Sequence, residues 1–513
     1  MSAAPTYIAP REFILKSAWR FVRGNAFAVA ALSALLLVPC FWHRRIQAGD
    51  LGSHIYNAWL AQLVKRHEVT GLVVVRQWSN VLFDLLVLRV ADLWGFVAAE
   101  RITVSLVVLI FFWGSFSFIA SVSARPPWMV TPFLFVVAYG YAFHMGFMNY
   151  YLSVGLAFLA LAAASRNGTA NWTAAVLLAA LALVAHPIGF AIFTGVAIYL
   201  AIRRMLPEPA LLALLAAMAA LFYALRLYFG AHPELAASWR CESWLQLFGQ
   251  DQMKVYGRHY EILSWLALGW GLLCAAAAAY DWLFRAKKPA AALRLAVELY
   301  AITVIGTACL PENFRTTLYA GWVGLLVSRL TLVTAVFGLL GLASLPLPRW
   351  SWRGALLLAA VFFGLLYRDT GKLDRMEANA RALAKSMPFG TRIVAVANAP
   401  EDWRVGFIYH SIDRACIGHC FSYANYEASS LQFRVRALPG NSVVTTSVDQ
   451  SDDMSSGDYL VRKNDLPLLS IYQCDDADFT VLCALPLREG QKTEDPESDP
   501  VPVPDSESDS EEN

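Results

Sequence analysis

The chain has 513 residues, of which 58% are hydrophobic and 16% are charged, and its formal net charge is +2. A soluble protein carries about a quarter charged residues, so this composition excludes an ordinary soluble globular protein. The small net charge gives no argument for nucleic-acid binding. Apolar stretches of about 15–25 residues recur from Asn25 to Tyr367, and stretches of that length can cross a bilayer as helices.

These stretches predict an all-α polytopic membrane protein with about eleven transmembrane helices. The first starts late and is followed by no small-residue cleavage site, so we expect a membrane span and not a cleaved signal peptide. The short stretches on either side of His186-Pro187 could also form one broken helix. The stretches cover about 25–42, 102–122, 129–146, 150–165, 172–186, 188–202, 209–229, 262–284, 293–310, 320–345 and 354–367.

Basic residues indicate the orientation of these helices. Four of them lie before the first span and favour a cytoplasmic N-terminus, whereas Arg44 and Arg45 behind it argue more weakly for the opposite. Alternate later connections, which would lie on the cytoplasmic side, also carry basic residues: Arg125, Arg166, Arg203, Arg204, Arg285, Lys287, Lys288, Arg349 and Arg353. We therefore expect a multi-pass protein of the bacterial inner membrane, with its N-terminus in the cytoplasm and its C-terminal domain in the periplasm.

Composition divides the chain into four parts. Residues 1–24 form a cytoplasmic segment, and 25–367 form the transmembrane domain, with a long amphipathic first outer loop over 43–100. Residues 368–490 are expected to form a small α+β extracytoplasmic domain. Residues 491–513 are acidic and rich in Pro and Ser, so they cannot bury a core and should be disordered.

Within the soluble domain, the pattern predicts a helix over 371–387 and strands near 392–397, 442–447 and 479–485. An even number of cysteines there suits disulfides in an oxidising compartment: Cys416, Cys420, Cys474 and Cys483. Alternatively, Cys416 and Cys420 could bind a metal with His410 and His419. Disulfides or free thiols are favoured, because a zinc site usually has two close ligand pairs and only one is evident.

The first outer loop opens with the most informative stretch, Ala48-Gly-Asp50-Leu-Gly-Ser-His54-Ile-Tyr-Asn-Ala-Trp59. If a helix begins near Asp50, then Leu51, Ile55 and Trp59 form an apolar stripe, and Asp50 and His54 project from neighbouring turns of one face. A carboxylate and an imidazole together can accept a proton or hold a divalent ion such as Mg²⁺ or Mn²⁺. Alternatively, Asp50 caps a helix on the membrane surface and His54 is merely exposed.

An acidic residue just after the first span, many later spans and a C-terminal extracytoplasmic domain together resemble the GT-C superfamily of membrane glycosyltransferases. The local sequence Gly49-Asp50-Leu-Gly-Ser-His54 looks like the first-loop motif of bacterial members. The resemblance implies a polyprenyl-phosphate-linked sugar as donor, inversion at the anomeric carbon, and Asp50 as general base. The chain departs from better-known members in lacking a paired-acid motif there, and also a second acid in the loop from His144 to Asn149.

Further polar residues on the expected outer side are candidates for binding the sugar or its phosphate. Each also has a structural interpretation, as an interfacial arginine, an aromatic belt, a turn or a solvated face. Charges inside spans should face protein or a water-filled cavity. Of these, Glu298 could pair with Arg294, and Arg329 could hold a phosphate or pair with Glu298. The candidates are Asp84, His144, Asn149, His186, Arg258, His259, Arg315 and Arg329.

Other functions stay open at this level. A secondary transporter would often show two related halves, and no internal repeat is evident. A polysaccharide polymerase or ligase would share outward polar loops and lipid-linked substrates, and a non-catalytic membrane scaffold would only present the C-terminal domain. The expected partners are membrane lipid, the lipid-linked donor, and a glycan, lipid or protein acceptor.

Overall fold

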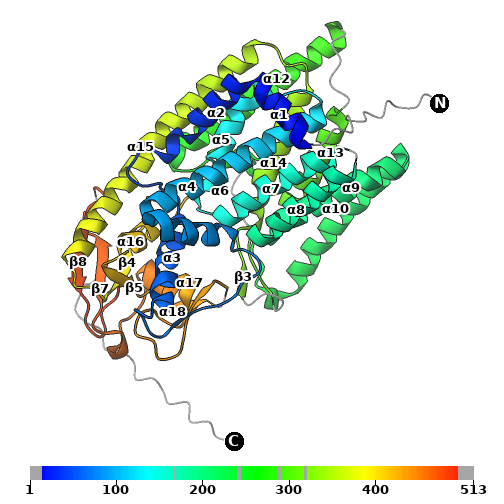
Figure 1. Cartoon of the computed structure of the whole chain (residues 1–513). Helices are drawn as coiled ribbons and strands as arrows, with labels where there is room; N and C mark the ends of the chain where they lie inside the picture. The colour runs from blue at the N-terminus through cyan, green and yellow to red at the C-terminus, as the bar shows by residue number, and fades with distance from the viewer. Residues whose placement is uncertain are drawn as a thin grey trace, which may run out of the picture. The chain divides into compact units, whose positions relative to one another are not determined.

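The computed structural model describes residues 14–494, apart from 167, 240–243, 286–291, 317–320, 431 and 476. These residues are mostly helical and belong to two compact units (Figure 1). The first unit comprises the residues up to 46, 77–370 and 401–405, and the second comprises 47–76, 371–400 and 406 onwards. The tail from 495 and the segment before 14 lie outside the described residues, and so does the disorder expected of that tail.

Six helices in the described part of the chain are long and apolar enough to cross a membrane, which agrees with a membrane-embedded protein. α15 belongs to both units, because its residues from 371 onwards are part of the second unit. The six are α4 (Leu82–Ser123), α9 (Pro187–Met205), α10 (Glu208–Ala231), α12 (Gly257–Arg285), α14 (Leu326–Ser344) and α15 (Trp350–Ser386).

Shorter helices make up the rest of the first unit, and every stretch expected to span the membrane contains helix. The first span is a bent pair that would count as a seventh crossing if taken as one. The shorter helices are α1 (Ile14–Gly24), α2 (Ala26–Leu37), α5 (Thr131–Ala138), α6 (Tyr141–His144), α7 (Met148–Ala164), α8 (Thr169–Ala185), α11 (Leu245–Phe248) and α13 (Leu293–Cys309). Short 3-10 turns are η1 (Val38–Cys40), η2 (Trp128–Val130), η3 (Pro233–Leu235) and η4 (Gln250–Met253), and β2 (Phe314–Thr316) pairs with β3 (Gly321–Val323).

α7 lies at the centre of the helix packing, against α4, α8 and α9. Glycines allow these close approaches: a methyl group on Gly114 of α4 would overlap the carbonyl oxygen of Gly155 on α7. A methyl group on Gly189 of α9 would likewise overlap the side chain of Ser153. Small residues have this use in membrane helix pairs, where packing and not water drives association.

α4 contains a break before the apolar span expected over 102–122. Gly95 has φ +79°, a conformation that L side chains rarely adopt, and the helix changes direction there. The part of α4 before the break belongs to the outer loop expected over 43–100, and the span expected over 102–122 lies after the break.

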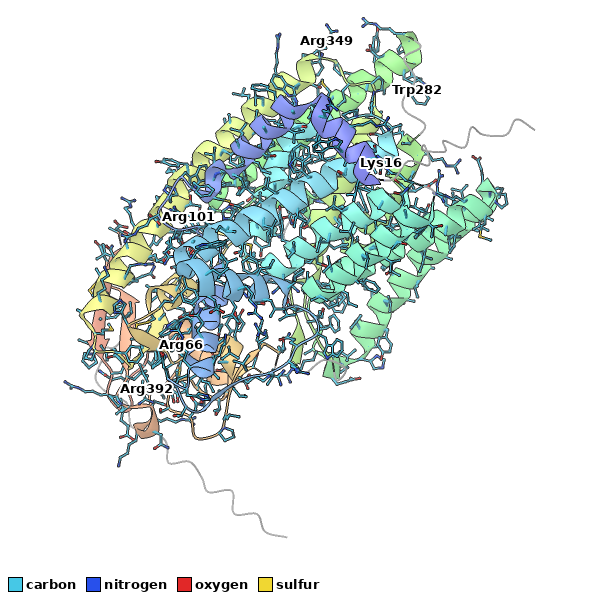
Figure 2. The ribbon with its side chains drawn as sticks, in the orientation of Figure 1. Lys16, Arg66, Arg101, Trp282, Arg349 and Arg392 are labelled. Carbon is cyan, nitrogen blue, oxygen red and sulfur yellow. A yellow bond between two sulfur atoms is a disulfide. The ribbon has the colours of Figure 1, made fainter. Side chains whose placement is uncertain are left out.

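The charge of Glu298, which was expected inside a span, is paired in the structure. In Figure 2, Lys16, Trp282 and Arg349 lie toward one end of its helices, and Arg101 lies farther from that end. The buried carboxylate of Glu298 accepts from Arg294 at 3.0 Å, as predicted, and also from Arg203 at 2.6 Å.

The second unit contains a mixed four-stranded sheet in the order β5-β4-β7-β8. The central strand β4 (Thr391–Val396) pairs in parallel with β5 (Cys420–Ser422) and β7 (Leu469–Gln473), and β8 (Leu482–Pro486) is antiparallel to β7. Around the sheet are α3 (Leu51–Lys65), α16 (His410–Ala415), α17 (Tyr426–Ser429), α18 (Val448–Ser456) and η5 (Lys463–Asp465), and a ribbon of β1 (Leu72–Val74) with β6 (Val435–Ala437).

Two of the three strands expected in the soluble domain are confirmed, as β4 and β8, and the helix over 371–387 is the end of α15. The strand expected near 442–447 is wrong. There the side-chain oxygen of Asn441 accepts from the backbone N–H groups of Val443 and Val444, both at 2.9 Å. This local turn satisfies backbone donors that a strand would give to a neighbour.

Candidate functional site

The Asp50 motif forms α3, which is buried on all its faces from Leu51 to Leu63. Asp50 occupies the N-cap position, yet its side chain makes no capping hydrogen bond. His54 is only 7% exposed. The alternative of a capped helix on the membrane surface with an exposed histidine is therefore wrong, because α3 packs between α16, α17, β1 and β6 of the second unit.

Asp50 stands at the end of a row of three side chains. His410 Nε2 lies 3.5 Å from Asp50 Oδ1, and His410 Nδ1 lies 2.8 Å from Asp413 Oδ2. Ser422 Oγ donates to the other oxygen of Asp413 at 2.6 Å. The side chain of Asp50 is 17% exposed, whereas those of His410 and Asp413 are 3% and 6% exposed, so the row leads from the interior to Asp50.

The row is charged. Burial lowers the pKa of His410, but the hydrogen bond with Asp413 and the negative charges of Asp413, Asp50 and Glu427 outweigh burial, and the net pKa is raised above 6.5. The imidazolium form is thus favoured between its carboxylates. Burial also raises the pKa of the neighbouring Tyr409, which stays a neutral phenol.

His54 has a separate carboxylate partner from the C-terminal segment. Its Nδ1 lies 3.8 Å from Glu427 Oε1, which accepts from Ser53 Oγ at 2.8 Å. One turn further along α3, the side-chain amides of Asn57 and Asn425 exchange two hydrogen bonds, at 3.2 and 2.9 Å. The two residues predicted to act as a pair thus each contact a different residue of the second unit.

Gly52 explains how α3 comes so close to α16. A methyl group on Gly52 would overlap the backbone carbonyl of His410, so only glycine fits at this crossing. The motif therefore supplies both the carboxylate of Asp50 and, two residues later, the space that brings His410 to it.

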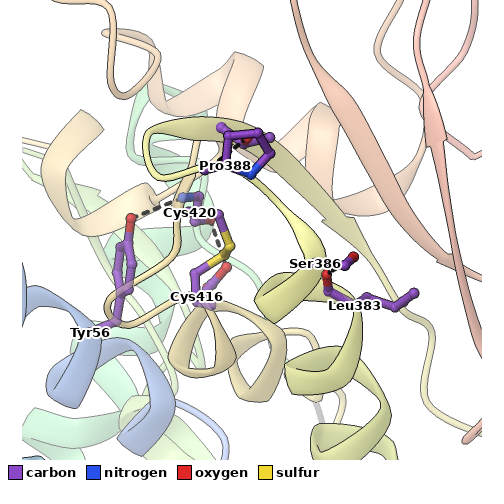
Figure 3. The surroundings of a disulfide bond; sticks show 9 residues. Tyr56, Leu383, Ser386, Pro388, Cys416 and Cys420 are labelled. Carbon is purple, nitrogen blue, oxygen red and sulfur yellow. Dashed lines mark hydrogen bonds between the residues drawn. A yellow bond between two sulfur atoms is a disulfide. The ribbon is translucent and has the colours of Figure 1, made fainter.

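Two disulfides stabilise the second unit, as favoured from the even number of cysteines. Cys416–Cys420 joins the end of α16 to β5, and Cys474–Cys483 joins the end of β7 to β8. Figure 3 shows the first of them beside Tyr56 of α3, whose hydroxyl accepts from the backbone N–H of Ser422 at 2.9 Å. The alternative metal site at Cys416 and Cys420 is wrong, because both thiols are bonded to each other.

A buried ionic cluster lies next to the row. Glu377 of α15 accepts from Arg414 Nε at 3.1 Å and from Arg414 Nη2 at 2.5 Å, and both side chains are 1% exposed. Arg381 and Gln47 also donate to Glu377, at 2.7 and 2.8 Å. Because Arg414 follows Asp413 directly, this cluster fixes α16 to α15.

Two of the predicted substrate-binding residues of the first unit contact each other. Asn149 Nδ2 donates to Asp84 Oδ2 at 2.8 Å, and Asn149 Oδ1 accepts from the backbone N–H of Phe83 at 2.8 Å. The side chain of Asn149 thus satisfies the first turn of α4. This gives both residues a structural role.

The histidines of the first unit also have partners. His144 is 2% exposed, and its Nδ1 lies 3.1 Å from the hydroxyl of Tyr256. His186 separates α8 from α9, and its Nδ1 accepts from the backbone N–H of Ile188 at 3.2 Å. His186 is therefore the N-cap of α9.

Arg329 does not pair with Glu298, so that alternative is wrong. Its Nη1 donates to the carbonyl of Gly324 at 2.8 Å, and its guanidinium lies 4.5 Å from the centroid of the Phe147 ring. The remaining candidates, Arg315 on β2 and His259 on α12, have exposed side chains.

Arg258 lines a hollow of about 750 Å³ in the first unit. Its backbone N–H donates to Asp402 Oδ2 at 3.1 Å, which satisfies the start of α12. Lys254, also in the hollow, pairs with Glu261 at 3.2 Å. Two tryptophans, Trp265 and Trp403, also line the hollow. Aromatic faces and carboxylates can bind a sugar, and cations can bind a phosphate.

Among the described residues, no group of three or more His, Cys, Asp or Glu is arranged to hold a metal ion. Asp50 and His54 contact protein partners instead, and the Mg²⁺ or Mn²⁺ considered for them stays a prediction. No known protein family, curated protein or solved structure matches this chain.

Asp413 and Glu427 were missed from the sequence, and His410 was considered only as a metal ligand. The signal for the first was present: His410-Ser-Ile-Asp413 has the spacing of neighbours on one helix face. Glu427 gave no such signal, because its partners Ser53 and His54 lie far away in the chain.

Proposed function

We propose that the protein is a membrane glycosyltransferase that moves a sugar from a polyprenyl-phosphate donor to an extracytoplasmic acceptor, with inversion and with Asp50 as general base. The observation that carries this proposal is the state of Asp50. It is a partly exposed carboxylate at the start of α3, its side chain makes no helix cap, and a buried imidazole lies 3.5 Å away. A carboxylate in such a position can accept a proton from a bound hydroxyl.

The chemistry requires one proton transfer. The acceptor oxygen forms a bond to the anomeric carbon while the bond from that carbon to the lipid phosphate breaks, and the hydroxyl proton passes to Asp50. Negative charge develops on the leaving phosphate and needs cationic stabilisation.

The proposal includes eleven spans, a cytoplasmic N-terminus and a periplasmic C-terminal domain in a bacterial inner membrane. The two disulfides support the periplasmic placement, because disulfides persist in oxidising compartments. The basic residues of alternate loops support the orientation.

The decisive test is sugar transfer by purified protein in nanodiscs, with a panel of polyprenyl-phosphate sugars and with or without Mg²⁺ or Mn²⁺. Asp50→Asn should lose at least about 10²-fold in turnover, the lower range for loss of a general base. Glu68→Gln, which removes an exposed carboxylate just after α3, is the matched control and should keep full activity.

Equal turnover by folded Asp50→Asn and wild type would remove Asp50 from the mechanism. Absence of turnover with every donor would favour a transporter or a polymerase or ligase of lipid-linked glycans. If cells that carry only the Asp50→Asn variant grow like wild-type cells, that result would favour a non-catalytic membrane scaffold.

A further inference from the structure

We propose that His410 and Asp413 are positioning residues that hold the carboxylate of Asp50 for proton transfer. This inference rests on the proposed function and deepens it, because it assigns two residues of the C-terminal segment to the same step. Neither residue exchanges a proton with the acceptor. The proton of the acceptor hydroxyl goes to Asp50 alone.

Both carboxylate oxygens of Asp413 have a partner, and these contacts fix its orientation toward His410. One of its oxygens accepts from Ser422 Oγ at 2.6 Å and the other lies 2.8 Å from His410 Nδ1. With both oxygens engaged, the carboxylate cannot turn without losing a buried hydrogen bond. It therefore sets the plane of the imidazole and directs Nε2 toward Asp50.

Three acidic residues from three elements act on His410. Asp413 comes from its own helix, Asp50 from the start of α3, and Glu427 from α17. Three aromatic rings also contact His410, with centroids 4.3 Å away in Tyr409, 5.2 Å away in Tyr426 and 6.2 Å away in Phe407. A cationic imidazole beside Asp50 favours the ionised carboxylate, which is the form that a base requires.

A base must be accessible to the substrate, whereas the residues that position it need not be. The supporting members of the row are almost fully buried, and only Asp50 at its end is accessible to a substrate. The contact of His410 with Asp50, at 3.5 Å, is also longer than its contact with Asp413. Hydrogen bonds of a catalytic group are often long without substrate and shorten when it binds.

The first test compares His410→Gln and Asp413→Asn with wild type in the nanodisc assay. Misplacement of a base by about 1 Å costs about 10²-fold, so kcat should fall by that order while the KM for donor stays within about twofold. In a series of pH values, the acid limb of kcat/KM should move to higher pH in His410→Gln, because a neighbouring cation favours the ionised form of a carboxylate and the variant lacks that cation. His419→Gln, in the same segment, is the matched control and should behave as wild type.

A purely structural role would lower the unfolding temperature of both variants without moving the acid limb, and that result would overturn the proposal. A kcat within about twofold of wild type in folded Asp413→Asn and His410→Gln would overturn it too. Asp413→Asn keeps the size of the side chain and can still accept from Ser422, so it covers the case in which His410→Gln does not fold.

A second measurement does not depend on activity. In protein with ¹⁵N-labelled histidine, the imidazole signals of His410 should shift in Asp50→Asn, and those of His419 should not. Unchanged His410 signals would overturn the proposal. Wild-type protein that transfers no sugar but shows the shift would refute the proposed function while supporting the placement of Asp50 by His410.

Discussion

His410 is a buried titratable group whose contribution to stability depends on pH. Its pKa is raised above 6.5 in the folded protein, so the folded state holds this proton more tightly than the unfolded state. The resulting stabilisation is fully present below the unfolded pKa and is lost as the pH rises through the folded pKa.

We therefore expect the unfolding temperature of the wild-type protein to fall as the pH is raised from about 6 to about 9, and to fall less in His410→Gln. Thermal unfolding in one detergent at constant ionic strength measures both profiles. Parallel profiles for the two proteins would show that His410 does not carry this proton. His419→Gln should reproduce the wild-type curve.

At the scale of single residues, the sequence predicted Asp50 but not its surroundings. The spacing of Asp50, His54 and the apolar residues of α3 is a local pattern, so it can be read from about ten adjacent residues. The partners are not local: Ser53 contacts a residue 374 positions later. A periodic pattern describes neighbouring residues only, so it carries no information about a contact between residues so far apart in the chain.

Among the elements, α16 is attached to α15 by a buried charge pair. Arg414 is among the largest fully buried side chains of the described residues, and Glu377 on α15 is its bidentate partner. Removal of one member leaves a buried charge without compensation, which typically costs about 3–5 kcal/mol.

Glu377→Gln should accordingly lower the free energy of unfolding by that order, and should also weaken the attachment of α16. Denaturant unfolding followed by the exposure of Cys416 and Cys420 to alkylation under reducing conditions measures both effects. Glu489→Gln, an exposed carboxylate of the same unit, serves as the control and should change stability by less than about 0.5 kcal/mol. A similar small change for Glu377→Gln would contradict the importance of the pair.

At the scale of elements, helices were predicted well and the environment of α3 was not. Long apolar stretches predict helices without knowledge of the neighbours, and each of them contains helix. The stripe of Leu51, Ile55 and Trp59 predicted one buried face, whereas all faces of α3 are buried. The polar residues of its other faces, such as Ser53 and Asn57, are buried with hydrogen-bond partners, and the hydrophobic period does not report such burial.

For the whole molecule, the cysteines test the side of the membrane on which the second unit lies. In protein taken from membranes without reductant, Cys416, Cys420, Cys474 and Cys483 should resist alkylation until a reductant is added. Cys40, Cys274 and Cys309, which are free, should react after denaturation alone. Mass spectrometry of alkylated peptides distinguishes the two groups. Free thiols at all positions would argue for a reducing compartment and against the proposed orientation.

Composition and apolar stretches were sufficient to predict a helical membrane protein, because insertion into lipid depends on length and hydropathy alone. The division of the chain into two compact units could not be predicted from composition. Residues 47–76 were expected as part of an outer loop of the transmembrane domain, and in the structure they belong to the same unit as the C-terminal segment. Composition does not reveal that a segment completes a core formed by distant residues.

The assembly of the second unit from separate segments has a consequence for synthesis. α3 ends at Lys65, whereas the next segment of its unit begins at residue 371, about 300 residues later. At about 5–20 residues per second, the ribosome needs roughly 15–60 s to make that interval. During this time α3 has left the ribosome, but α16, α17 and β6, which bury it together with β1, do not yet exist. The second unit can therefore fold only after translation of the membrane helices, and α3 must be protected by something other than its final neighbours until then.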